Sequence, residues 1–128
     1  MKKLIISMLS VIAVAAAGSV YAGSNEGVRC IKKGSTVQAV YDKGSNGRTV
    51  RRNIRVGSSY KGGQCMGRCG AACGGWLPSA WTKDCLDHDI CIVDQNGQNG
   101  GAGDTNCGDE FRQAADDYIT GVIRGCRG

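Results

Sequence analysis

The order of apolar and polar residues divides the chain into two parts with different periods. In the first part, three short runs rich in β-branched residues cover 28–32, 36–41 and 49–56. Turn-forming residues separate these runs, at Gly34-Ser35 and over 43–47, as between neighbouring strands. The pattern therefore predicts a small N-terminal β-meander.

In the second part, apolar residues recur every three or four positions, which is the period of an amphipathic helix. We expect a first helix that follows Ser79-Ala80-Trp81-Thr82 and runs to about residue 94, because Pro78 stands just before this segment and proline is favoured near helix starts. A second helix should run over about 108–124, where Gly125 would end it. One stripe of the first helix carries Trp81, Cys85, His88 and Ile92, with Asp89 at its margin. The apolar face of the second helix carries Phe111, Ala114, Ala115, Tyr118 and Val122.

The N-terminal 22 residues have the pattern of a secretory signal peptide. Lys2 and Lys3 precede an apolar run over 4–17, and small side chains stand at Val20 and Ala22. The run is shorter than the roughly 20 residues that a spanning helix needs. We therefore expect a secreted protein, extracellular or periplasmic, whose mature chain begins at Gly23.

All eight cysteines lie in the mature chain, and an even number in a short exported protein is typical of a disulfide framework. The few aromatic residues and 21 glycines predict a core too small to be stable without such bridges. We expect one compact domain with a basic β-like region at 23–63 and a helical region at 64–128. The predicted fold class is mainly α and disulfide-rich: two antiparallel helices, a Gly/Cys-rich loop and the small meander. The cysteines are Cys30, Cys65, Cys69, Cys73, Cys85, Cys91, Cys107 and Cys126.

Charge is distributed unevenly along the mature chain. Ten basic and two acidic residues lie in 23–68, whereas four basic and nine acidic residues lie in 69–128. The basic half could bind an anionic surface such as phospholipid, and the acidic half could bind a hard cation. Neutralisation of one half by the other within a single domain is an equally good interpretation.

The chain has a single histidine, His88, which stands beside Asp89 between Cys85 and Cys91. Histidine is the side chain that can accept a proton near neutral pH, so a lone histidine next to a carboxylate is a candidate general base. A buried histidine with a purely structural role is the alternative.

The motif Cys85-x-x-His88-Asp89-x-Cys91, preceded by the loop Cys69-Gly70-Ala71-Ala72-Cys73-Gly74-Gly75, resembles the secreted phospholipase A2 superfamily over about 64–126. The resemblance implies a calcium-dependent hydrolase that cleaves a phospholipid acyl ester, with His88 as the base that activates water. It also implies that Ca²⁺ is held by the Asp89 carboxylate and by backbone carbonyls of Arg68, Gly70 and Ala72, with Cys73 or Gly74 as alternatives to Ala72. Such a set of oxygens suits Ca²⁺. The phospholipid membrane surface, which could be anionic, is the expected partner.

The same resemblance implies a Cys69–Cys85 bridge and a carboxylate on the second helix that orients His88. If Cys91 pairs with Cys107, Asp109 is nearest to the position of that carboxylate, and Asp116 and Asp117 are competitors. Helical-wheel angles leave the choice open, because Asp109 and Asp116 both lie off the Phe111 face. The pairing of the other four cysteines stays open, since eight cysteines allow 105 patterns.

Three other classes of function compete with the hydrolase. Three cysteines four residues apart could bind Zn²⁺ with His88, but free thiolates are not expected in an oxidising compartment. Nucleic-acid binding is not expected, because no aromatic residues alternate with the basic ones. The main alternative is a non-catalytic, disulfide-stabilised module that binds an anionic surface or partner. It would use Arg51, Arg52, Arg55 and Lys61.

Overall fold

The computed structural model describes residues 27–43, 47–70, 73–74, 78–95 and 101–128, so the predicted signal peptide and the centre of the 43–47 turn lie outside the described residues. Two strands and two helices follow one another along the chain. They are β1 (Thr36–Asp42), β2 (Thr49–Arg55), α1 (Lys83–Gln95) and α2 (Gly108–Arg124). No helix in these ranges is both long and apolar enough to cross a membrane.

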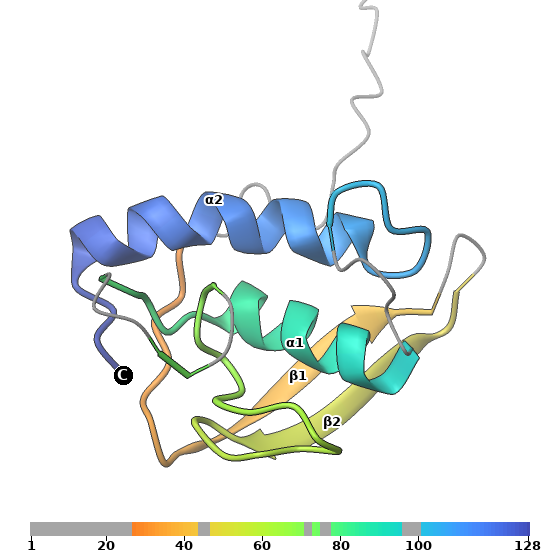
Figure 1. Cartoon of the computed structure of the whole chain (residues 1–128), viewed down its shortest axis with the longest axis horizontal. Coiled ribbons are helices and arrows are strands. Elements are labelled where there is room, and N and C mark those ends of the chain that lie inside the picture. The colour runs from red at the N-terminus through yellow and green to blue at the C-terminus, as the bar shows by residue number, and fades with distance from the viewer. Residues whose placement is uncertain (1–26, 44–46, 71–72, 75–77, 96–100) are drawn as a thin grey trace, which may run out of the picture.

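The elements form three layers, with α1 in the middle (Figure 1). The antiparallel hairpin β1–β2 packs on one side of α1, and α2 runs antiparallel to α1 on the other side. Helix accounts for about 34% and strand for about 22% of the described residues. The predicted mainly α class is therefore wrong: a β-hairpin and two helices share the fold.

The predicted meander has two strands, not three. Thr36 pairs with Arg55 and Asp42 with Thr49 at the two ends of the hairpin. The segment 28–32 is not a third strand, because its backbone pairs with the chain before α1 instead of with β1. Cys30 forms an isolated bridge with Thr82, and the Ile31 N–H donates to the Trp81 carbonyl at 3.0 Å.

The first helix begins where the sequence predicts, directly after Thr82, and ends at Gln95. Thr82 caps it, because the Cys85 N–H donates to the Thr82 hydroxyl oxygen at 3.2 Å. The second helix covers the predicted residues, and Gly125 ends it in the left-handed conformation at φ 76°. The Gly125 N–H donates to the Val122 carbonyl at 3.1 Å.

Two clusters of buried side chains hold the layers together. The larger one lies between α1 and the hairpin and includes Leu86 and Ile90, which are fully buried. The smaller one lies between α1 and α2 and consists of short side chains, among them Ala80, Ala114 and the Cys69–Cys85 bridge. Short side chains let the two helices approach closely along this line.

All eight cysteines form disulfides, as the sequence predicts. Cys69–Cys85 attaches the Gly/Cys-rich loop to α1, and Cys91–Cys107 joins α1 to the start of α2. The two pairs that the sequence left open are Cys30–Cys126 and Cys65–Cys73. No thiolate remains for the alternative zinc site.

Carboxylates of the helices bind the hairpin. The Val40 N–H donates to Asp87 of α1 at 2.7 Å, and the Asp42 N–H donates to Glu110 of α2 at 3.0 Å. These donors lie along β1, so the helices satisfy backbone groups of this strand that would otherwise form an open edge. Burial raises the pKa of Asp87 and Glu110, and the hydrogen bonds to Lys83 and Asp42, respectively, oppose the effect.

Candidate functional site

His88 and Asp89 face one pocket of about 510 Å³ between α1, α2 and the loop at 68–70. The two helices contribute its walls, and α2 contributes mainly apolar side chains. A concave, largely apolar pocket with a few convergent polar groups is the usual form of a ligand site. It is lined by Arg68, Cys69, Gly70, Cys85, His88, Asp89, Ile92, Phe111, Ala114, Ala115, Tyr118 and Ile119.

His88 is half-buried in the middle of α1. The imidazole lies edge-on to the Phe111 ring of α2, with 5.4 Å between the ring centroids. Two disulfides fix this part of α1: Cys85 is bonded to the loop, and Cys91 is bonded to the start of α2. The position of the imidazole relative to the loop and α2 is therefore covalently constrained.

Asp89 lies next to the loop, where its carboxylate accepts a hydrogen bond from the Gly67 N–H at 2.8 Å. Gly67 has φ +93°, and a Cβ atom there would come within 2.7 Å of the Ile31 side chain, so only glycine suits this position. Burial raises the pKa of Asp89 to about 7, because the hydrogen bond from Gly67 offsets only part of the cost of desolvation.

The donor chemistry around Asp89 fits a hard cation in part. A half-buried carboxyl with a raised pKa gains from a neighbouring positive charge, and Arg68 and Gly70 of the expected calcium loop line the same pocket. Ala72, the third predicted carbonyl ligand, lies outside the described residues. No group of three or more His, Cys, Asp or Glu side chains in the described ranges could hold a metal ion, so the loop backbone would have to supply most of the ligands.

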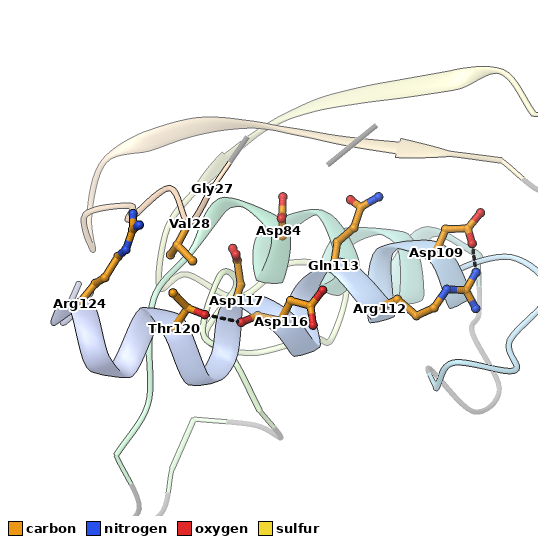
Figure 2. Close-up of a pocket in the computed structure, with 10 residues that line it drawn as sticks. All are labelled: Gly27, Val28, Asp84, Asp109, Arg112, Gln113, Asp116, Asp117, Thr120 and Arg124. Carbon is orange, nitrogen blue, oxygen red and sulfur yellow. Dashed lines mark hydrogen bonds and ion pairs between the residues drawn. The ribbon is translucent and has the colours of Figure 1, made fainter. Parts of the chain in front are cut away.

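The carboxylates expected to orient His88 lie elsewhere. Asp109, Asp116 and Asp117 all line a different pocket, on the other flank of α2 (Figure 2). Asp109 forms an ion pair with Arg112 and is exposed. Packing decides this arrangement: α2 rests on α1 along the buried line through Ala114 and Gly121, which leaves Phe111 on the flank that faces His88.

The predicted basic cluster is divided between two environments. Arg52 and Lys61 form ion pairs with Asp94 of α1 at 3.2 and 2.8 Å, whereas Arg51 and Arg55 are exposed on β2. Part of the basic half is thus neutralised by the acidic half within the domain, as one interpretation of the charge pattern holds.

Sequence reasoning did not assign two features of the site. It placed Phe111 and Tyr118 on an apolar face but did not identify this face as the wall of the His88 pocket. The signal was present: Phe111, Ala115, Tyr118 and Ile119 follow helical spacing beside the small residues at 114 and 121. It also missed Asp94, which accepts four side-chain hydrogen bonds from the hairpin and the segment after it.

The chain belongs to a family described as a domain of unknown function (DUF8213), whose model matches residues 26–128. The match covers both the hairpin and the two helices, so the family is defined by the whole disulfide-linked fold. No curated protein and no solved structure matches the chain.

Proposed function

We propose that this protein is a secreted, calcium-dependent hydrolase of the phospholipase A2 type, which cleaves an acyl ester of a phospholipid after removal of residues 1–22. One observation carries the proposal. The only histidine of the chain, its neighbouring carboxyl and the Gly/Cys-rich loop line one pocket whose remaining wall is mostly apolar.

Each part of the pocket has a task in this reaction. The wall formed by Phe111, Tyr118 and Ile119 suits the acyl chain, whose transfer from water is favourable. His88 takes a proton from the attacking water and then returns it to the leaving alcohol. Contact with Phe111 holds the imidazole in place, so the proposal does not rely on Asp109.

Asp89 and backbone carbonyls of the loop, from Arg68, Gly70 and Ala72, would hold Ca²⁺. When bound, this ion supplies a Lewis acid that polarises the ester carbonyl and stabilises the oxyanion. The exposed Arg51 and Arg55 would favour substrate in an anionic membrane surface.

The test follows fatty-acid release from mixed vesicles of phosphatidylglycerol and phosphatidylcholine while Ca²⁺ is titrated. We expect His88→Gln to lower the rate at least about 100-fold, the usual effect of removing a general base. Asp89→Asn should remove both turnover and the response to Ca²⁺. Asp109→Asn is the matched control: it removes a carboxylate of α2 outside the His88 pocket and should leave the rate within about twofold. Undiminished release by His88→Gln, or by the native chain in excess EGTA, would refute the mechanism.

A second candidate is a non-catalytic module that binds an anionic surface through its basic half. It is favoured by Arg51 and Arg55, which are both exposed on β2 on the face of the strand opposite the buried Ile54. In this case His88→Gln would leave vesicle sedimentation unchanged with no fatty acid released by any variant, whereas Arg51→Gln and Arg55→Gln together would weaken sedimentation.

A further inference from the structure

A second pocket, of about 530 Å³, lies on the flank of α2 opposite the His88 pocket (Figure 2). Its walls come from one face of α2, from the first turn of α1 and from the segment at 27–28. Four carboxylates and two guanidinium groups line it: Asp84, Asp109, Asp116, Asp117, Arg112 and Arg124. Negative charge is therefore in excess.

Asp117 gives this pocket an unsatisfied acceptor. The residue is only 5% exposed, and its side chain rises from α2 toward Asp84 of α1 (Figure 2). The Asp117 carboxyl receives hydrogen bonds from the Thr82 hydroxyl and the Asp84 N–H. Its Oδ2 atom is buried and has no hydrogen-bond partner among the residues that the structure describes. A buried acceptor without a partner is costly, so a ligand that donates a hydrogen bond here would be stabilised.

The charges around Asp117 favour a cation. Burial is the main cause that raises the pKa of Asp117, and the neighbouring Asp116 adds to the effect, while Arg124 opposes it. Arg112 already forms an ion pair with Asp109 at the far end of the pocket, so its charge is balanced there. Among the described residues that line the pocket, Arg124 is therefore the cation left to balance Asp116 and Asp117.

The pocket suits an organic cation better than a metal ion. Its carboxylates are spread along the helix, and none of the described residues form a group of three side chains that could coordinate a metal. Seven residues separate Asp109 from Asp116, which corresponds to about 10 Å along α2. Val28, in the segment before β1, adds an apolar side chain to the wall of the pocket. This combination fits an aliphatic chain with ammonium groups.

We propose that the pocket between Asp84, Asp116 and Asp117 binds an aliphatic amine in its ammonium form, which donates a hydrogen bond to the unpartnered oxygen of Asp117. The site is independent of the His88 pocket and of the reaction proposed for it. Asp117 lies at the inner end of the pocket, and Asp116 is exposed at its entrance. The distance of about 10 Å along α2 from Asp116 to Asp109 sets the length of the ligand.

The test measures binding of spermidine to the mature, disulfide-bonded protein by isothermal titration calorimetry at low and physiological salt. We expect saturable binding that Asp116→Asn and Asp117→Asn each weaken about tenfold, the loss typical of removing a charged hydrogen-bond partner. Asp42→Asn is the matched control, since it removes the same charge at an exposed site outside the pocket; binding should stay within about twofold. His88→Gln should bind spermidine like the native chain.

Because Asp117 is buried, its variant could lose stability, so the melting temperature of each variant is measured in parallel. The exposed Asp116 then decides: unchanged binding by a folded Asp116→Asn overturns the proposal. An equal loss with Asp42→Asn would show attraction by net charge and would also overturn it. So would displacement of spermidine by an equal concentration of Mg²⁺, which would indicate a site for an inorganic cation.

Discussion

Asp94 links the C-terminal end of α1 to the hairpin, and replacing it by Asn gives the sharpest test of how the layers are held together. Its carboxylate is almost fully buried, with 4% of the side chain exposed. It accepts hydrogen bonds from the hydroxyls of Tyr41 and Tyr60 at 2.8 and 3.1 Å. It also accepts from Arg52 Nε at 3.2 Å and from Lys61 Nζ at 2.8 Å.

The size of the effect follows from the pKa. Burial alone would raise the pKa of Asp94, but the four donors outweigh it and lower the pKa from 3.8 to about 2. At about 1.4 kcal/mol per pKa unit the change is worth roughly 2 kcal/mol, and screening around the half-exposed Arg52 and Lys61 reduces it to about 1–2 kcal/mol. In Asp94→Asn an amide N–H₂ group also faces hydrogen-bond donors that it cannot accept from. We therefore expect the free energy of unfolding to fall by about 2 kcal/mol in total, which corresponds to a fall of roughly 10 °C in Tm.

The assay is thermal and guanidinium unfolding, followed by circular dichroism with the disulfides intact, for the native chain and Asp94→Asn. Because the pKa of Asp94 is lower in the folded than in the unfolded state, its contribution is complete above about pH 4. That contribution is lost as the pH falls toward 2, so the difference between the two proteins should shrink there. Asp116→Asn, an exposed carboxylate of α2, is the control and should change stability by less than about 0.5 kcal/mol. The reasoning would be refuted if Asp94→Asn lowered the free energy of unfolding by less than about 0.5 kcal/mol at pH 7. It would also be refuted if the difference between the two proteins were as large at pH 2 as at pH 7.

Two further predictions concern the packing of the helices and the disulfides. Gly121→Ala should destabilise the protein by about 1–3 kcal/mol in the same unfolding assay, because the new Cβ would lie 2.7 Å from the Ala80 Cβ; native stability would show that α2 shifts freely. Replacing Cys30 and Cys126 by serine should cost about 2 kcal/mol more than replacing Cys65 and Cys73, because these bridges span 96 and 8 residues and loop-closure entropy grows with the logarithm of that span. Equal losses in guanidinium unfolding would contradict the entropic account.

Local signals in the sequence determined the second helix and the limits of the hairpin. The Gly125 cap and the period of the apolar residues mark α2 correctly, since both act within a few residues. The start of α1 directly after Thr82 was also predicted, because the proline signal at Pro78 lies within a few residues of it. The segment 28–32 was taken for a strand because β-branched residues favour extended backbone, but propensity does not identify the partner, which here is the segment before α1.

The site was predictable as far as it lies within one helix. Neighbours on α1, such as His88 and Asp89, face the same pocket because helix geometry fixes their relation. The carboxylate partner on α2 could not be chosen, because the wheel shows only that Asp109 and Asp116 share a face. Which flank that face occupies depends on how α2 rests on α1, and this is set by the small residues Ala114 and Gly121. The pairing of Cys30 with Cys126 likewise depends on tertiary packing that no local pattern reveals.

The bridge between Cys30 and Cys126 joins positions close to the two ends of the folded chain. A mechanical load applied outside this pair passes through a covalent bond and never reaches the hairpin or the helices. When the oxidised domain is stretched between its ends, the bridge therefore prevents the chain between the two cysteines from unfolding and extending. Only reduction would release the chain between the two cysteines, whose sequence separation of 96 corresponds to about 330 Å of contour length at roughly 3.4 Å per residue.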